Sequence, residues 1–221
     1  MNVPRTALSI LRSVAAPIGL PALVICLLTL FGLAKLTEDV FEQETHRFDV
    51  SVLLWTHHFA NGIADHVALG LTFLGNPVWV VFVIALSFAL LWMAGWRSEA
   101  MMLLVACAGA FALDVGLKLS FRRERPALWP HLVSETSYSY PSGHALFSLA
   151  LYGFLAYIMA SRFPRLAWLW YGGACVLVVG IGVSRLYLGV HWPSDVMAGF
   201  AVGLLWLVTC IALLRSADLA A

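Results

Sequence analysis

Six stretches of the sequence are long enough to cross a lipid bilayer and, apart from Asp114 in the third, carry no charged side chain. The hydrocarbon core takes roughly 17 to 25 helical residues, and the stretches occupy residues 17–34, 67–96, 100–117, 145–161, 166–184 and 196–214. With 62% hydrophobic and 11% charged residues in 221, the composition lies far outside that of a soluble domain. The sequence therefore predicts an all-α, polytopic membrane protein: one domain over residues 1–221 with six transmembrane helices in a bundle. The second stretch is the longest and is interrupted by Asn76-Pro77, which leaves its limits open.

The orientation follows from the distribution of Lys and Arg in the short loops. An even number of spans puts both termini on one side, and the first stretch has no signal cleavage pattern at its end, so we expect it to stay as an anchor. With cytoplasmic termini, the inner segments hold Arg5, Arg12, Arg97, Arg162, Arg165 and Arg215. The outer segments hold seven basic residues, of which only Lys35 and Arg47 lie away from residues 118–195. We therefore expect cytoplasmic termini, in the plasma (inner) membrane, and a site on the extracytoplasmic (periplasmic) face.

The outer segment 37–66 alternates apolar side chains with acidic and polar ones, which predicts a helix lying in the membrane interface. It also contains four histidines: His46, His57, His58 and His66. Their spacing matches no common pattern of metal ligands. No metal site is predicted here, and the segment has no assigned role.

A basic cluster follows the third span, from Lys118 to Arg125-Pro126. Asp114 and Lys118 are four residues apart on a helix and share a face, so we predict an ion pair between them. Taken alone, such a cluster is also typical of a surface patch that attracts anionic lipid head groups. Charges at the ends of hydrocarbon-like spans need a polar partner, and a tetrahedral oxyanion would provide one.

The run Pro141-Ser142-Gly143-His144 stands directly before the fourth span. The first amides of a helix lack intrahelical partners and bind anions. We expect the amides of Ser142, Gly143 and His144 to point outward, with Gly143 allowing close approach of a phosphate and the Ser142 hydroxyl adding a donor. An ordinary helix cap is the alternative, but it does not explain His144 at the membrane boundary.

The fifth span ends at Ser184-Arg185, on the same predicted side as the two preceding clusters, and His191 and Asp195 follow. Asp195 can accept a hydrogen bond from one imidazole nitrogen of His191. A carboxylate that fixes the tautomer in this way leaves the other nitrogen free to attack. A helix cap made by Asp195 beside an isolated His191 is the alternative. The other charged groups on the same face favour the nucleophilic arrangement.

These residues resemble the three-part signature of the type 2 phosphatidic acid phosphatase (PAP2) family. That family includes six-span lipid phosphatases, glucose 6-phosphatase and, more distantly, soluble vanadium-dependent haloperoxidases. The likeness is close over residues 118–195, whereas the first two spans agree in number and placement only. It implies a metal-independent phosphatase without cofactor, in which His191 attacks phosphorus, Asp195 orients it and His144 protonates the leaving oxygen. The phosphoryl oxygens would be held by Lys118, Arg125, Ser142, Gly143 and Arg185, while Arg122, Arg123 and His131 lie outside the signature.

The expected function is hydrolysis of a membrane lipid phosphate or diphosphate, such as phosphatidate, phosphatidylglycerophosphate or a polyprenyl diphosphate, through a phosphohistidine intermediate. A phosphotransferase or haloperoxidase could use the same site, and a non-catalytic protein could bind anionic lipids with the same cations. Because capture of a head group does not need an oriented histidine pair, His144, His191 and Asp195 favour an enzyme. The partners expected are the bilayer and its lipid phosphates; a formal net charge of +1 gives no indication of nucleic acid. The motifs specify neither the head group nor the oligomeric state.

Overall fold

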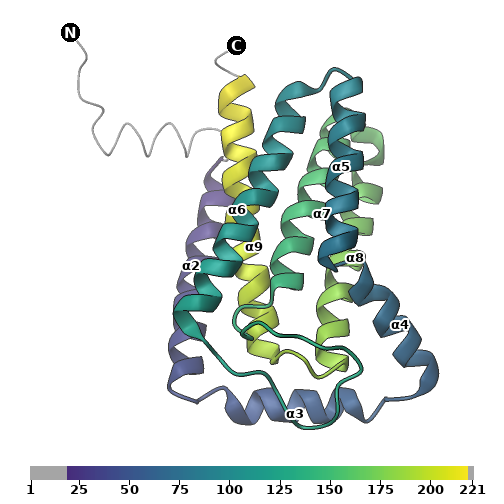
Figure 1. Cartoon of the computed structure of the whole chain (residues 1–221). Coiled ribbons are helices and arrows are strands. Elements are labelled where there is room, and N and C mark those ends of the chain that lie inside the picture. The colour runs from purple at the N-terminus through teal and green to yellow at the C-terminus, as the bar shows by residue number, and fades with distance from the viewer. Residues whose placement is uncertain (1–18, 219–221) are drawn as a thin grey trace.

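The computed structural model describes residues 19–218, which form an upright helical bundle with one helix lying across its lower end (Figure 1). This confirms the predicted all-α fold, while Arg5 and Arg12 lie outside the described residues. The long helices are α2 (Gly19–Phe41), α5 (Pro77–Met93), α6 (Arg97–Phe121), α7 (Gly143–Arg162), α8 (Ala167–Tyr187) and α9 (Pro193–Asp218). The shorter elements are α3 (His46–His57), α4 (Gly62–Phe73) and the 3-10 turn η1 (Pro164–Leu166).

Five of these helical segments are long and apolar enough to span a membrane, and a sixth span is obtained if α4 and α5 are counted together. These two helices are bent by 48° at the break that the sequence marks with Asn76-Pro77. The Asn76 side chain accepts a hydrogen bond from the Val78 amide at 3.0 Å, so a new helix starts there. The Leu74 carbonyl at the break accepts a hydrogen bond from the Tyr152 hydroxyl at 2.6 Å. Such pairing is what allows an interrupted helix inside a membrane.

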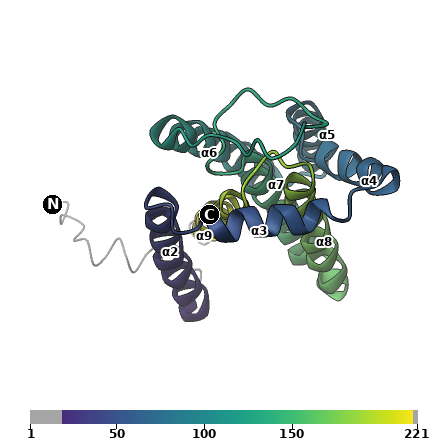
Figure 2. The ribbon, with the colours of Figure 1, turned by 90° about the horizontal axis from the view of Figure 1, so that it is seen from below.

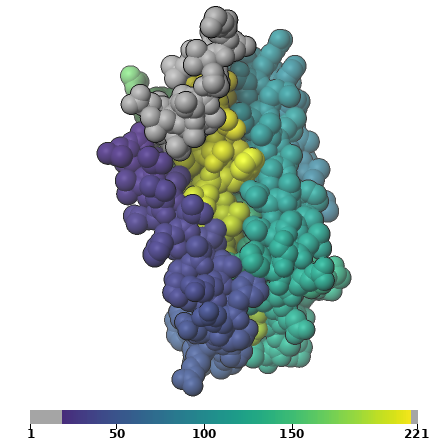
Figure 3. All heavy atoms as spheres, turned by 90° about the vertical axis from the view of Figure 1, so that its left-hand side faces the viewer, coloured from purple at the N-terminus to yellow at the C-terminus, as the bar shows by residue number. Residues whose placement is uncertain are grey.

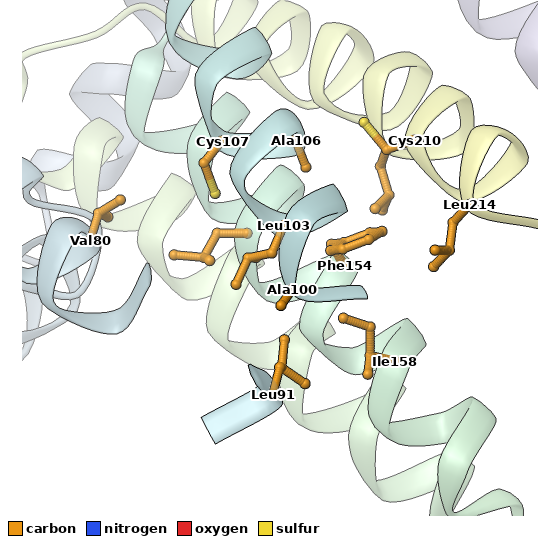
Figure 4. Close-up of a cluster of buried hydrophobic side chains, with 12 residues drawn as sticks. Val80, Leu91, Ala100, Leu103, Ala106, Cys107, Phe154, Ile158, Cys210 and Leu214 are labelled. Carbon is orange, nitrogen blue, oxygen red and sulfur yellow. The ribbon is translucent and has the colours of Figure 1, made fainter. Parts of the chain in front are cut away.

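Helix α7 is the centre of the bundle and packs against α6, α8 and α9. Buried side chains of α5, α6, α7 and α9 form the main apolar cluster, which includes Leu103 of α6 and Phe154 of α7 (Figure 4). The Trp206 indole of α9 donates a hydrogen bond to the Ala106 carbonyl of α6 at 2.8 Å. The elements that carry the signature residues are therefore fixed by the best-packed part of the chain.

Helix α2 is peripheral and packs on α9, which remains visible between α2 and α6 in Figure 3. Val40 is its only buried residue among those described, and large apolar side chains such as Phe31 (74% exposed) point outward. An exposed apolar face of this kind suits contact with lipid chains. The helix continues past the predicted limit at residue 34 to Phe41.

The lower end of the bundle is covered by two segments, seen from below in Figure 2. Helix α3 crosses beneath α8 and α9, and the loop 122–142 arches from α6 toward α5. Of the predicted interfacial segment 37–66, only His46–His57 forms this crosswise helix, because residues at either end belong to α2 and α4. Its outer face exposes Phe48, Leu54 and Trp55, whereas Asp49 and Leu53 are buried. We call this end of the bundle, with α3, loop 122–142 and residues 188–192, the site end.

Candidate active site

His191 and Asp195 lie together at the site end, immediately before and within the first turn of α9. Both are buried, and His191 Nδ1 is 3.4 Å from Asp195 Oδ2. The other imidazole nitrogen, Nε2, is 3.1 Å from Arg125 Nη1. A guanidinium can only donate, so Nε2 must be the acceptor and Nδ1 carries the proton that faces Asp195. The available lone pair of His191 is therefore on Nε2, among cationic side chains.

The protonation state of His191 follows from its surroundings. Burial, and then the neighbouring charges of Arg125 and Arg185, hold its pKa well below the usual 6.5. The imidazole is uncharged at neutral pH as a result. An uncharged ring keeps the Nε2 lone pair that nucleophilic attack requires.

The Asp195 carboxylate is held by three donors besides the histidine. Ser139 Oγ donates to Oδ2 at 2.5 Å, the Trp192 amide donates to Oδ2 at 2.9 Å, and Arg123 Nη1 donates to Oδ1 at 2.6 Å. Neither Ser139 nor Arg123 was assigned from the sequence. These contacts fix the carboxylate in one orientation relative to the imidazole.

Arg125 and Arg185 approach the site from the loop and from the end of α8. Arg125 also donates to the Val190 carbonyl at 2.7 Å, and Arg185 donates to Thr72 Oγ1 at 2.6 Å. Glu135 of the loop joins the two: its carboxylate pairs with Arg185 and lies 3.6 Å from Arg125 Nη2. Both arginines thus already face an anionic group of the chain itself.

Lys118 and Asp114 form the predicted ion pair on α6, with Lys118 Nζ 3.1 Å from Asp114 Oδ1. The pair packs against the first residue of α7. A Cβ atom at Gly143 would lie 2.8 Å from Asp114 Oδ1 and 3.1 Å from Lys118 Nζ. Only glycine therefore lets the start of α7 approach the cation this closely.

Ser142 occupies the N-cap position of α7, which begins at Gly143, but its side chain makes no capping hydrogen bond. Its amide donates to the backbone carbonyl of Asp195 at 2.9 Å, so the prediction that this amide points freely outward is wrong. The reason is that the chain before α7 lies directly against the first turn of α9. Among the residues that the structure describes, the buried Ser142 Oγ and Arg185 Nε have no hydrogen-bond partner. Buried donors without a partner are costly, and an oxyanion would satisfy them.

His144 lines a cavity of ≈ 770 Å³ that extends from the site along α5 and α6. The His144 ring packs against the break between α4 and α5. A glycine is needed there, because a Cβ atom at Gly75 would lie 2.7 Å from the ring. At the site end the lining is polar and includes Lys118, Glu135, His144 and Arg185. Further along, it is formed by Val80, Val81, Ile84, Leu104, Cys107, Phe111 and Phe147.

Within residues 19–218, no group of three or more His, Cys, Asp or Glu side chains could hold a metal ion. The histidines of the outer segment make contacts with different partners. His57 stacks on Trp129 of the loop with ring centroids 4.1 Å apart, and His66 Nδ1 is 2.5 Å from the Gly62 carbonyl oxygen.

Comparison with known proteins identifies the family. The sequence model of the PAP2 superfamily matches residues 99–217, which run from the first turn of α6 to the last turn of α9 and include every signature residue. The chain is 33% identical over 144 residues to phosphatidylglycerophosphatase B of Bacillus subtilis (strain 168), covering 64% of this chain and 70% of that protein. The chain therefore belongs to the PAP2 superfamily, and it is a multi-pass membrane phosphatase of the lipid phosphatase type.

Other relatives agree. An undecaprenyl-diphosphatase of Sulfolobus acidocaldarius is 44% identical over 68 residues, or 31% of this chain and 30% of that one. The crystal structure of a transmembrane PAP2 type phosphatidylglycerolphosphate phosphatase from Bacillus subtilis superposes with a TM-score of 0.80 at 26% identity, covering 88% of this chain and 96% of that chain. The LpxE structure from Aquifex aeolicus, at 21% identity, has a TM-score of 0.60, covers 75% of this chain and 94% of that one, and shares the fold.

Proposed function

We propose that this enzyme hydrolyses the phosphate of a membrane lipid phosphate or diphosphate. The observation that carries the proposal is the cavity, which has a polar end lined by Lys118, His144 and Arg185 and an apolar part between α5 and α6. A phosphate ester with a hydrocarbon chain matches both parts at once. The names of the relatives, a phosphatidylglycerophosphatase and an undecaprenyl-diphosphatase, support a lipid monophosphate or a polyprenyl diphosphate as substrate.

In the proposed reaction, His191 Nε2 attacks phosphorus and the bond to the leaving oxygen breaks. His144, at the cavity wall, gives a proton to that oxygen. A water molecule then attacks the phosphorus of the phosphohistidine, His144 takes a proton from this water, the bond between phosphorus and His191 Nε2 breaks, and inorganic phosphate leaves. The Asp195 carboxylate stabilises the positive charge that the imidazole acquires.

The phosphoryl oxygens would be held by Lys118, Arg125 and Arg185, with Ser142 Oγ and the start of α7 at Gly143 as further donors. Phosphoryl transfer needs mainly positioning and charge neutralisation, and these groups supply both. Glu135 now pairs with both arginines. A phosphate must take its place, so Glu135 has to withdraw when substrate binds.

We propose that a lipid enters sideways between α5 and α6, keeping its chains in the bilayer. Side chains that line the cavity and are also exposed at the surface, Val81 and Phe111, support this route. A lateral path would favour long-chain substrates, since the hydrocarbon never has to enter water.

Release of phosphate by purified chain in detergent tests the proposal. Long-chain lipid mono- and diphosphates are compared with glycerol 3-phosphate at equal concentration, with and without excess chelator or orthovanadate. We expect strong preference for the lipids, activity that persists with chelator, and inhibition by vanadate. Equal hydrolysis of glycerol 3-phosphate would contradict the proposed lipid substrate and indicate a soluble phosphate ester instead. Absence of phosphate release from every lipid would overturn the proposed hydrolase, and transfer to an added alcohol would then indicate a phosphotransferase.

For the orientation, we propose that the site end faces the periplasm across the plasma (inner) membrane and both termini the cytoplasm. Support comes from the opposite end of the bundle, where Arg97, Arg162 and Arg165 lie at the helix ends. Single cysteines at Thr136 and at Ser161, both exposed, are treated with an impermeant thiol reagent in intact cells. Position 136 should be labelled directly and position 161 only after permeabilisation, with the four native cysteines giving the background. The opposite pattern would reverse the orientation.

A further inference from the structure

The crosswise helix α3 inserts one carboxylate into the site end. Asp49 is 0% exposed, whereas the apolar side chains of Phe48, Leu54 and Trp55 on the same helix are exposed. Its Oδ1 accepts a hydrogen bond from the Ser194 amide at 3.0 Å, and its Oδ2 accepts one from Ser194 Oγ at 2.6 Å. Ser194 directly precedes Asp195. Asp49 therefore reaches the residue next to the one that faces His191.

Arg123 lies between the two buried aspartates and binds both. Its Nη2 donates to Asp49 Oδ2 at 2.8 Å, and its Nη1 donates to Asp195 Oδ1 at 2.6 Å. The guanidinium also lies over the Trp192 ring, 5.5 Å from its centroid. Arg122, the preceding residue, is in the left-handed conformation with φ 49° and ends α6. This turn separates the two arginines: Arg122 bonds back to its own helix at Leu119, while Arg123 points into the site.

The formal charges of Asp49, Arg123 and Asp195 together contribute to the electrostatic potential at the His191 imidazole. Asp195 and Arg123 alone would form a neutral pair, and a neutral pair gives little stabilisation to a cationic imidazole. The second carboxylate changes the sum, because two aspartates and one arginine leave a single negative charge. Buried ion pairs contribute little to stability once desolvation is counted, so the presence of two fully buried carboxylates on an arginine that is only 14% exposed calls for another reason.

We propose that Asp49 and Arg123 are positioning residues for the phosphatase reaction: Arg123 fixes the Asp195 carboxylate, and Asp49 offsets the charge of Arg123 so that one net negative charge still faces His191. This inference rests on the proposed function of His191 as nucleophile. Attack on phosphorus makes the imidazole cationic, and the net negative charge stabilises that state and the transition state that leads to it. Through Asp49, helix α3 thereby contributes to the active site.

The test is a double-mutant cycle with Asp49→Asn, Arg123→Met and the double variant, using phosphate release from a long-chain lipid phosphate in detergent. Asp49→Asn leaves a neutral pair and should lower kcat about 10- to 100-fold with little change in KM, a range known for outer partners of metal-bound histidines. Arg123→Met leaves two buried carboxylates that repel each other and should be impaired as well. The double variant has one negative charge again, so its kcat should exceed that of both single variants.

A purely structural anchor predicts the reverse, because the double variant lacks more contacts than either single one. A double variant that does not exceed both single variants in kcat overturns the proposal. Asp65→Asn is the control: Asp65 accepts a hydrogen bond from Tyr187 at 2.6 Å, which joins α4 to α8 and does not involve Asp49, Arg123 or Asp195, so its kcat should stay near that of the wild type. If Asp49→Asn cannot be purified in folded form, kcat of the double variant is compared with kcat of Arg123→Met alone. The proposal then requires the higher kcat for the double variant. Failure of the wild-type chain to release phosphate would instead count against the proposed function.

Discussion

Charged side chains at the two ends of the bundle have opposite surroundings. At the end away from the site, Arg162 is 43% exposed, pairs with Glu99, and lies 4.7 Å from the centroid of the Trp96 ring. At the site end, Arg185 is 1% exposed and Asp195 is 0% exposed. The first arrangement combines basic and aromatic side chains at a helix end, as is usual where a span meets water.

The difference indicates that charged side chains at the far end anchor the helices at the membrane surface, whereas those at the site end serve the reaction. Exposed ion pairs contribute at most about 1 kcal/mol, and their removal should be tolerated. Buried ones are costly to form, and loss of one partner leaves a charge without compensation. Substitutions at the site end should therefore affect activity strongly, and matching substitutions at the other end should not.

The largest effect is expected for His191→Ala, which removes the attacking nitrogen. Activity should fall on the order of 10⁵- to 10⁶-fold on a lipid phosphate and on nitrophenyl phosphate alike, as when a protease loses its nucleophile. Labelled substrate quenched in alkali should trap an acid-labile phosphoprotein with the wild type but not with this variant. Retention of label in His191→Ala would assign the nucleophile elsewhere.

His144→Ala should come next, and its effect should depend on the leaving group. A lipid alcohol leaves as a strongly basic alkoxide and needs a proton, so the loss should be about 10²- to 10⁴-fold. Nitrophenolate leaves readily without one, so kcat on nitrophenyl phosphate should change much less. Equal losses on both substrates would contradict the role of general acid.

Glu135→Gln should have a smaller effect of the opposite kind. The variant removes the anion that pairs with Arg125 and Arg185, so inorganic phosphate should inhibit roughly tenfold more strongly, a change of about 1.4 kcal/mol. The inhibition constant for phosphate measures this. Glu124→Gln, in the same loop but exposed, is the control and should leave the constant unchanged. An unchanged constant in Glu135→Gln would mean that this carboxylate does not compete with phosphate.

The smallest effect is expected at the other end, for Arg162→Gln. The unfolding free energy should drop by at most about 1 kcal/mol, and kcat on a lipid phosphate should stay near that of the wild type. Thermal unfolding in detergent and phosphate release measure the two quantities. A loss of activity comparable with that of His144→Ala would contradict the distinction between the two ends.

The sequence predicts the helices and the family well, since both depend on local patterns. Apolar runs of bilayer length define the spans, and the proline break at Asn76-Pro77 is visible as a pattern, although its 48° bend is not. Asp114 and Lys118 pair as expected because four residues on a helix fix their distance. The single-domain organisation and the roles of the site residues remain predictions.

Contacts of the site with residues outside the signature could not be predicted. Asp49 is one of several acidic residues in the outer segment, and nothing in its neighbourhood distinguishes it from Glu42 or Glu44. Only the packing of α3 under α9 brings it to Ser194 and Arg123. Ser139 and Glu135 likewise lie in a loop without periodicity. The position of Arg123 in the basic cluster indicated that it lies near the site, but no sequence pattern indicated its partners.

The division of the cavity lining has a consequence for how such an enzyme can diversify. The residues proposed for chemistry lie on α6 to α9 and the loop between α6 and α7, whereas much of the apolar lining comes from α5, which precedes the matched residues 99–217. The α5 part of the lipid-facing wall is thus encoded apart from the residues proposed for chemistry, while α6 and α7 contribute to both. We expect that exchange of α5 alone could change which lipids are accepted while the phosphate-cleaving apparatus is inherited unaltered.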